Sequence, residues 1–306
     1  MLDRHGAVPA LGRDAGVAEH YGDPYAEQRA LEAGRAVVDL SHRPVLEVRG
    51  PDRLTWLHDL TSQALRDLAP GVPVESLVLS PQGHVEHHLQ LVDDGEAVRL
   101  HVEPGTADAL RTWLDRMRFM LRVEVADVSA DWDVVGTAAS WSLVPAGALQ
   151  ASDAEVAGVG AHEALRVAAQ RPRLGVDTDH RTIPNETSWL TTAVHLDKGC
   201  YRGQETVARV ANLGRPPRRL ALLHLDGSDS ELPAQGADVL LDGRAVGAVG
   251  TSVRHHELGP IALAMVKRQV PLDAALSVDG IAAQLDDSAV EQERARAARP
   301  ELMRFR

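Results

Sequence analysis

The apolar positions in the first part of the chain alternate between helical and extended spacing. Residues 22–36 are predicted to form a helix, and residues 36–48 are predicted to be extended with a turn at 41–44. Gly50 and Pro51 open a second helix, with Asp52 in its first turn, where a negative charge suits the helix dipole. The apolar stripe expected on this helix consists of Leu54, Leu57, Leu60 and Leu65.

Residues 75–137 are predicted to combine mostly antiparallel strands with one further helix. Strands are expected near residues 75–79, 85–92, 97–102, 121–128 and 132–137. Asp94 and Gly95 are a hairpin signal between two of them. Thr106 is expected to cap a helix whose buried face is Leu110, Trp113, Leu114 and Met117. Because strands and helices do not alternate one by one, the pattern indicates an α+β fold rather than a βαβ fold.

The pattern changes after residue 219. Short apolar runs fill residues 220–285, and Asp-Gly pairs at 226–227, 242–243 and 279–280 separate them. Strands with tight turns at this spacing predict a small barrel or sandwich. The last twenty residues are rich in Glu, Arg and Ala, so we expect a frayed helix or a disordered tail there.

Length, net charge and cysteine count exclude several classes of protein. The chain has 306 residues, which is more than one core usually serves, and its net charge of −12 argues against a broad nucleic-acid or anionic-membrane face. The N-terminal residues lack an apolar signal region, and no run of the sequence is apolar enough to span a membrane. Cys200 is the single cysteine, which excludes an intrachain disulfide and a multi-cysteine metal site built from this chain alone. We therefore expect a cytoplasmic protein.

Residues 197–209 contain the largest group of candidate functional side chains. Cys200 stands between Gly199 and Gly203, with the cations Lys198 and Arg202 two residues away on either side. Nearby cations lower a thiol pKa and favour the reactive thiolate. Gln204 and Glu205 add hydrogen-bonding groups that could reach a small polar ligand. A buried, inert cysteine on a tight turn is the alternative, because free cysteines are commonly buried.

Residues 198–205 resemble the K-G-C-[FY]-x-G-Q-E signature of the YgfZ-like proteins, relatives of the glycine-cleavage aminomethyltransferase (GcvT). Val38-Asp39-Leu40-Ser41 followed by Val48-Arg49-Gly50 is similar to the opening of the aminomethyltransferase fold. Leu79-Ser80-Pro81-Gln82-Gly83 resembles its first hairpin, and residues 259–264 resemble its last barrel. The similarity thus extends along most of the chain.

The resemblance implies a GcvT-like three-part ring of two interleaved α+β units plus a C-terminal antiparallel β-barrel. The expected divisions are a folate-binding region at 1–219 with an inserted unit at about 51–130, a barrel at 220–286 and a tail at 287–306. Tetrahydrofolate or another reduced folate is the implied cofactor. Lys198, Tyr201, Arg202, Gln204 and Glu205 are implied contacts of that folate, with Cys200 as the reactive thiol.

Residues 183–189, which contain Pro184, Glu186 and Trp189, resemble a run of the aminomethyltransferases in which the glutamate binds the pterin ring. The resemblance gives Glu186 this role and places Trp189 beside it. One carboxylate can accept both donors of the pterin's planar N3–H and 2-amino pair. Arg209 could meet the glutamyl tail of folate, or pair with Glu205 at helical spacing.

The sequence departs from the aminomethyltransferase pattern after Gly83. A gapless comparison puts His87 and His88 where those enzymes have an Asp-Asp pair, so we expect both histidines among the folate contacts. An imidazole cannot supply the fixed negative charge that aminomethyl transfer needs. Strand alternation would put His84, Glu86 and His88 on one face and His87 on the other. That face could bind a metal, but an exposed polar face is the commoner outcome, and we assign no metal.

The function expected from the resemblance is a tetrahydrofolate-binding protein that assists iron–sulfur cluster synthesis or repair, with iron–sulfur proteins or their assembly machinery as partners. One alternative is a folate-dependent aminomethyl- or methyltransferase. Another is an RNA-associated tRNA-modification factor that would use Arg215, Arg218 and Arg219, although a basic run of this kind is more often a solvated linker. A monomer is the default expectation.

Overall fold

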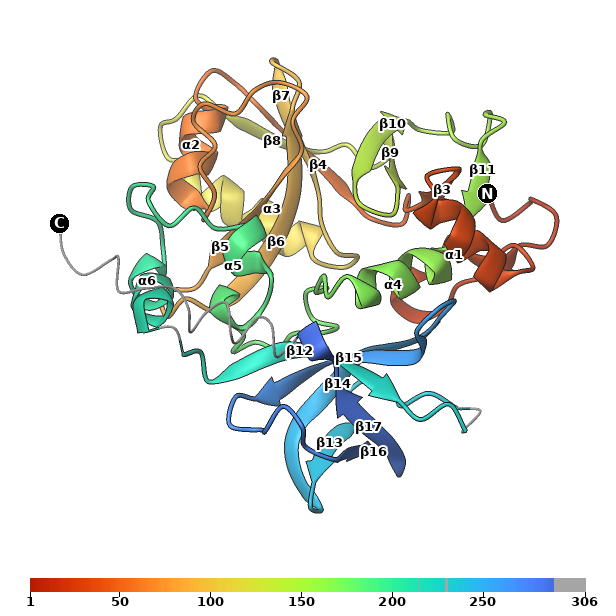
Figure 1. Ribbon diagram of the computed structural model, residues 1–306. Coiled ribbons are helices and arrows are strands. Elements are labelled where there is room, and N and C mark those ends of the chain that lie inside the picture. The colour runs from red at the N-terminus through yellow and green to blue at the C-terminus, as the bar shows by residue number, and fades with distance from the viewer. Residues whose placement is uncertain (214, 229–230, 289–306) are drawn as a thin grey trace. The chain divides into compact units, whose positions relative to one another are not determined.

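The computed structural model describes residues 1–213, 215–228 and 231–288, which form two compact units (Figure 1). Unit 1 comprises Met1–Pro81, Val85–Leu165 and Thr191–Arg202. Unit 2 comprises Gln82–His84, Arg166–Leu190 and the chain from Gly203 onwards. Of the expected tail, residues 289–306 lie outside the described residues.

A five-stranded antiparallel sheet forms one half of unit 1, in the order β5-β6-β7-β4-β8. Its strands are β4 (Val45–Arg49), β5 (Val74–Leu79), β6 (Val85–Asp93), β7 (Ala97–His101) and β8 (Glu124–Asp127). Helices α2 (Arg53–Leu60) and α3 (Ala107–Met117) lie beside it (Figure 1). Trp56, Leu57, Leu110 and Leu114 from these helices join the same core as Leu46, Val98 and Leu100 of the sheet.

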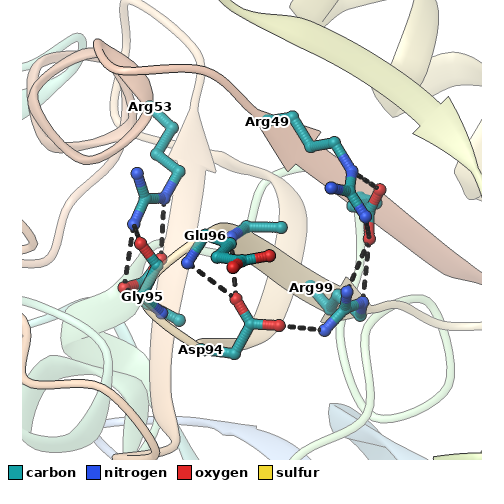
Figure 2. A network of polar contacts seen from close by, with 9 residues as sticks. Arg49, Arg53, Asp94, Gly95, Glu96 and Arg99 are labelled. Carbon is teal, nitrogen blue, oxygen red and sulfur yellow. Dashed lines mark hydrogen bonds and ion pairs between the residues drawn. The ribbon is translucent and has the colours of Figure 1, made fainter.

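The hairpin between β6 and β7 is tied to α2 and β4 by a network of ion pairs (Figure 2). Arg53 of α2 binds both carboxylate oxygens of Asp93, at 2.8 and 3.2 Å, and donates to the Gly95 carbonyl oxygen at 2.6 Å. Arg99 bridges Asp94 and the buried Glu47. The predicted hairpin at Asp94 and Gly95 therefore forms, and the network fixes it to its neighbours.

The second half of unit 1 is a four-stranded sheet in the order β10-β9-β3-β11. Its strands are β3 (Ala36–Asp39), β9 (Trp132–Gly136), β10 (Trp141–Pro145) and β11 (Glu155–Ala157), of which β3 and β11 are parallel. Helices α1 (Pro24–Glu32) and α4 (Val159–Ala168) cover it, and the last turn of α4 belongs to unit 2. The short pair β1 (Val8–Pro9) and β2 (Ala18–His20), with a 3-10 turn at Gly12–Asp14 between them, completes the unit.

Unit 2 is built around a closed six-stranded barrel, β12-β15-β14-β13-β16-β17. Its strands are β12 (Arg218–Leu225), β13 (Asp238–Leu241), β14 (Arg244–His255), β15 (Gly259–Lys267), β16 (Leu276–Val278) and β17 (Ile281–Leu285). Ile281, Ala283 and Leu285 alternate with exposed residues along β17 and fill the interior, as a small barrel requires. The expected α+β fold with a C-terminal antiparallel barrel is confirmed.

Residues that precede the barrel in the chain also belong to unit 2. They carry a 3-10 turn (Pro184–Glu186), the start of α5 (Trp189–Thr192) and α6 (Gln204–Leu213). The buried Asp177 joins this region to β14: it accepts hydrogen bonds from the Thr251 amide (2.8 Å) and hydroxyl (2.7 Å), and it pairs with Arg166 at 2.7 Å. Arg166 and Asp177, which precede the barrel in the chain, are therefore bound to β14.

Several local predictions differ from the structure at helix ends. Helix α2 begins at Arg53, so Pro51 precedes it, and Asp52 lies at the N-cap without capping because its carboxylate binds Arg122 at 2.9 Å. Leu65 lies beyond the end of α2, although it is buried in the expected core. Thr106 lies at the N-cap of α3, but its hydroxyl donates backwards to the Glu103 carbonyl oxygen.

Within the described part of the chain, no helix combines the length and the apolar character needed to cross a membrane.

Candidate functional site

The segment that leads to Cys200 is anchored to the loop after α2 and to β5. The Ser62 hydroxyl donates to the Ala193 carbonyl oxygen at 2.6 Å, and the His195 amide donates to the Ser62 carbonyl oxygen at 3.0 Å. The Thr192 hydroxyl donates to Glu75 at 2.7 Å. These contacts join positions more than one hundred residues apart, so the fold of unit 1 determines where this segment lies.

Lys198 closes the C-terminal end of α2. Its Nζ donates to the carbonyl oxygens of Thr61 (2.6 Å) and Gln63 (3.0 Å), and also to that of His58. Burial lowers the pKa of Lys198 to about 8, whereas the carbonyl oxygens at a helix C-terminus favour the charged form. An ammonium has three protons to donate, so these three carbonyls give Lys198 a structural role in unit 1.

Cys200 is free and exposed. The alternative of a buried thiol is therefore wrong, and the reactivity of Cys200 stays a prediction. Arg202, two residues later, forms a two-bond ion pair with Glu86 of β6, at 3.0 and 3.4 Å. The thiol thus lies between a residue anchored on α2 and a residue anchored on β6, which restricts the backbone on both sides of it.

Tyr201 is buried beside this frame, with 7% of its surface exposed. The Lys198 Nζ lies 5.1 Å from the centre of the Tyr201 ring, within cation–π range. Burial raises the pKa of Tyr201 to about 12, so its hydroxyl stays protonated at neutral pH. Within residues 1–213, 215–228 and 231–288, this hydroxyl has no hydrogen-bond partner.

The two histidines of β6 differ in environment. His87 lies opposite Val78 and His88 lies opposite Leu77, but the register shifts between Val78 and Leu79, which pairs with Val85. This irregularity interrupts the simple alternation that would have put His84, Glu86 and His88 on one face. In the described part of the chain, no group of three His, Cys, Asp or Glu side chains could hold a metal ion.

Burial makes His87 a neutral group. It lowers the pKa of His87 to about 4, and no hydrogen-bond partner of its Nδ1 is found among the described residues. The His88 Nε2 lies 3.5 Å from a carboxylate oxygen of Glu75, the same residue that accepts from Thr192. At the positions where the aminomethyltransferases carry two aspartates, this chain therefore presents a neutral imidazole and a histidine beside a carboxylate.

Glu186 lies in unit 2, in the 3-10 turn Pro184–Glu186, and its side chain is only 1% exposed. Arg218 binds both of its oxygens, with Nε at 2.8 Å from Oε1 and Nη2 at 2.9 Å from Oε2. The Ile183 amide donates to Oε2 as well, at 3.1 Å. The carboxylate therefore accepts a planar pair of N–H donors from Arg218 and a third hydrogen bond from a backbone amide.

Asp179 is the second partner of Arg218, at 2.6 and 3.1 Å. The paired guanidinium holds the pKa of Asp179 well below its usual range, and the two carboxylates raise that of Arg218. Arg219 is 7% exposed and donates to the Val270 carbonyl oxygen at 2.9 Å. The view of this basic run as a solvated linker is therefore wrong for Arg218 and Arg219, and the predicted RNA contact would have to compete with these internal bonds.

The remaining predicted ligand contacts lie around α6 and α5. Gln204 begins α6, and Glu205 and Arg209 are exposed on it. Within the described part of the chain, no ion pair joins Glu205 to Arg209. Trp189 is 1% exposed, and the neighbouring Asn185 donates to the Val207 carbonyl oxygen of α6 at 3.1 Å.

The predicted site residues thus fall into two groups. Unit 1 holds His87, His88, Lys198, Cys200, Tyr201 and Arg202, and unit 2 holds Glu186, Trp189, Gln204, Glu205 and Arg209. Sequence reasoning missed Glu75, Thr192 and the role of Arg218. A buried glutamate requires a cationic partner, and this could have pointed to the arginines at the start of β12.

Three comparisons relate this chain to known proteins. Residues 218–304 match the family described as CAF17, C-terminal beta-barrel domain. A protein of Arabidopsis thaliana named as a chloroplastic transferase is 25% identical over 289 residues, which cover 76% of this chain and 65% of the relative. An aminomethyltransferase of a Nostoc species is 28% identical over 233 residues, which cover 74% of this chain and 50% of the relative. The chain thus spans less than two thirds of the length of these relatives.

A solved structure shares the fold over almost the whole chain. The aminomethyltransferase T of the glycine cleavage system from Bartonella henselae superimposes with a TM-score of 0.76. The match covers 92% of this chain and 93% of that one, at 17% sequence identity. The chain therefore has the fold of the aminomethyltransferase T, and its sequence is similar to that of aminomethyltransferases and, at residues 218–304, to the CAF17 C-terminal barrel.

Proposed function

We propose that this protein binds a tetrahydrofolate through Glu186 and uses Cys200 as a reactive thiol in iron–sulfur cluster synthesis or repair. The iron–sulfur role comes from the resemblance of residues 198–205 to the YgfZ-like signature. The folate rests on that resemblance and on the aminomethyltransferases to which the chain is similar.

The observation that carries the proposal is the way Glu186 binds Arg218. Both carboxylate oxygens accept from one planar guanidinium, at 2.8 and 2.9 Å. The N3–H and 2-amino group of a pterin form a planar donor pair of the same kind, because that edge of the ring is a cyclic guanidine. The carboxylate therefore already has the geometry that the pterin edge requires.

The same observation adds a condition for binding. A pterin that takes both oxygens of Glu186 has to displace Arg218 from them. Asp179 binds Arg218 independently, at 2.6 and 3.1 Å, so it can keep the guanidinium when Glu186 accepts the ligand. Asp179 thus becomes a residue that affects folate affinity without contacting the folate.

Measuring the thermal midpoint with and without a stable reduced folate such as folinate tests this proposal. A ligand at about one hundred times its dissociation constant adds roughly 2.7 kcal/mol to the stability of wild type. Glu186→Gln keeps an oxygen for the Ile183 amide but loses the charge, so we expect the shift to vanish. Asp179→Asn should bind folate more weakly than wild type while retaining a measurable shift.

Either of two results would contradict the proposal. One is a folded wild-type protein whose midpoint does not respond to folate. The other is an undiminished shift in Glu186→Gln, which would mean that folate binds elsewhere. Folding of each variant is checked by far-UV circular dichroism before titration.

A folate-dependent one-carbon transferase is the second candidate, favoured by the names of the relatives. The neutral, partly buried His87 argues against ordinary aminomethyl transfer, because it offers no fixed negative charge at the position of the enzyme's aspartates. A turnover assay with aminomethyl or methylamine donors and tetrahydrofolate decides this, and the absence of a folate product counts against the transferase.

A further inference from the structure

The turn between α3 and β8 presents large apolar side chains to solvent. Phe119 and Met120 are 80% and 97% exposed, and the adjacent Leu121 is 45% exposed. Over residues 1–213, 215–228 and 231–288, every other exposed large apolar side chain stands alone in the sequence, as Leu11 does at 86%. Single exposed leucines are normal, whereas a run of adjacent apolar side chains in water marks a surface that another molecule covers.

The chain places a scarce residue at this turn. Aromatic residues make up 3% of the sequence, and Phe119 is one of two phenylalanines. Its backbone is left-handed, with φ of 47°, a conformation that a bulky side chain adopts only under strain. Neither the exposure of the ring nor this strain stabilises unit 1. Backbone strain of this kind is concentrated at functional positions.

Hydrogen bonds hold the turn in one conformation. The Leu121 amide closes it by donating to the carbonyl oxygen three residues earlier, at 3.0 Å. The Trp56 indole N–H of α2 donates to the Met117 carbonyl oxygen at 3.1 Å. The Asp52 carboxylate accepts from the Arg122 amide at 2.9 Å. Because the backbone is already fixed, little conformational entropy is lost when a partner binds the apolar side chains.

Positive charge borders the apolar run. Residues 116–122 contain three arginines and no acidic residue, in a chain whose net charge is −12. All three are exposed. Asp52 pairs with Arg122 at 2.9 Å, and the Arg118 Nη1 donates to the Val123 carbonyl oxygen at 3.4 Å, so both guanidinium groups are held beside the turn. The complement of this surface is an apolar surface with carboxylates at its edge.

We propose that residues 116–122 form a docking surface for a partner protein that offers an apolar pocket bordered by carboxylates. Aromatic residues, Met and Arg are enriched at the centre of protein interfaces, and they are the residues that this surface presents. An anionic bilayer fits less well, because its headgroups repel a chain of net charge −12. None of residues 116–122 is among the predicted folate contacts, so this docking surface is independent of the proposed function.

Photo-crosslinking followed by titration tests the docking surface. The photoreactive amino acid p-benzoylphenylalanine is placed at position 120 of the full chain in living cells of the source organism, and at position 11 as the control. We expect a protein to be crosslinked from position 120 and not from position 11. That protein is then purified and titrated calorimetrically with wild type, Phe119→Asn, Arg118→Gln and Leu11→Ser.

Phe119→Asn removes the apolar ring but should still fold. Asn adopts a left-handed backbone more readily than Phe, so the thermal midpoint of this variant should be no lower than that of wild type. We expect it to bind the crosslinked protein at least about tenfold more weakly than wild type does. Arg118→Gln should bind more weakly at low salt, and its difference from wild type should shrink at high salt, because salt screens the charges. Leu11→Ser should bind as wild type does.

Three results would overturn the docking surface. One is that position 120 crosslinks to no protein that position 11 does not also capture. Another is a crosslinked protein that binds Phe119→Asn as tightly as wild type. The third is that wild type, but not Phe119→Asn, sediments with vesicles of phosphatidylcholine and phosphatidylglycerol in equal parts, which would make a membrane the occupant.

Discussion

At the scale of single residues, side chains that look reactive in the sequence are paired with other groups in the fold. Lys198 was expected to act as a cation near the thiol, yet its ammonium closes the end of α2. Arg202 is paired with Glu86. The sequence pattern predicts a functional segment here, but the pairing partners of Lys198 and Arg202, which lie more than one hundred residues away, could not be read from it.

His87 gives the clearest pH dependence. Its pKa is about 4 in the folded chain and about 6.5 when unfolded, so the unfolded state binds the proton more tightly. The stability that comes from keeping His87 neutral is therefore fully present above about pH 6.5 and is lost as the pH falls towards 4. We expect wild type to lose about 2 kcal/mol more than His87→Gln between pH 7 and pH 4.5.

Urea unfolding of both proteins at the two pH values measures this difference. The variant removes the titrating group while keeping a polar side chain of similar size. Equal losses in the two proteins would mean that His87 does not contribute to the acid sensitivity, and that its burial in solution is smaller than the structure indicates.

At the scale of elements, the turn between α3 and β8 exposes three large apolar side chains. Phe119 and Met120 are 80% and 97% exposed, and Leu121 is 45% exposed. Phe119 also has a left-handed backbone, with φ of 47°, which is uncommon for a bulky residue. A hydrogen bond from the Leu121 amide to the Arg118 carbonyl oxygen closes the turn.

Replacing Phe119 by glycine should stabilise unit 1. Glycine adopts a positive φ without steric cost, whereas its greater freedom in the unfolded chain opposes folding. The relief of strain should be the larger effect, so Phe119→Gly should raise the free energy of unfolding by about 0.5–1 kcal/mol. Met120→Gly is the control, since its exposure is similar but its φ is not positive. An equal or greater gain in Met120→Gly would contradict the role of strain at Phe119.

The sequence predicted most of the elements because their periodicities are local. The strands at 75–79, 85–92 and 97–102 and the helix after Thr106 all form. The helix ends were harder to predict, because tertiary contacts decide them: Asp52 binds Arg122 instead of capping α2, and Thr106 binds backwards to Glu103. The irregularity in β6 that sets the faces of His87 and His88 also has no signal in the local sequence.

At the scale of the whole molecule, the chain passes between its two units several times, and one of these passages contains Gly83. Gln82–His84 belong to unit 2 although the strands on either side belong to unit 1. Gly83 has a φ of 83°, and a Cβ there would lie 2.9 Å from the Cβ of Thr206 in α6. The backbone approach at this point requires glycine.

Gly83→Ala should therefore cost more stability than a glycine replacement that introduces strain alone. Gly95 is the matched case, with a φ of 96° and no atom nearer than 3.9 Å to an added Cβ. We expect Gly83→Ala to be less stable than Gly95→Ala by about 1–2 kcal/mol, the usual cost of overpacking. Chemical denaturation of both variants measures this difference. Equal losses in the free energy of unfolding would show that the region around Thr206 accommodates the added methyl group without overpacking.

The fold of the whole molecule was predictable because the resemblance extends along most of the chain, and the structural match to an aminomethyltransferase confirms it. The site was predictable only in part. The resemblance predicts that Glu186 binds the planar donor pair of a pterin, but the sequence could not reveal that Arg218 binds both of its oxygens. That contact depends on the start of β12 lying against the turn Pro184–Glu186, which is a tertiary property of unit 2.

Folate binding is the central claim, and calorimetric titration of the wild-type protein with folinate, repeated with Glu186→Gln, tests it most directly. The account predicts saturable binding at one site in wild type and a loss of that binding in the folded variant. An absence of binding in wild type, or an unchanged affinity in Glu186→Gln, would contradict it: the chain would then keep the aminomethyltransferase fold without the pterin contact.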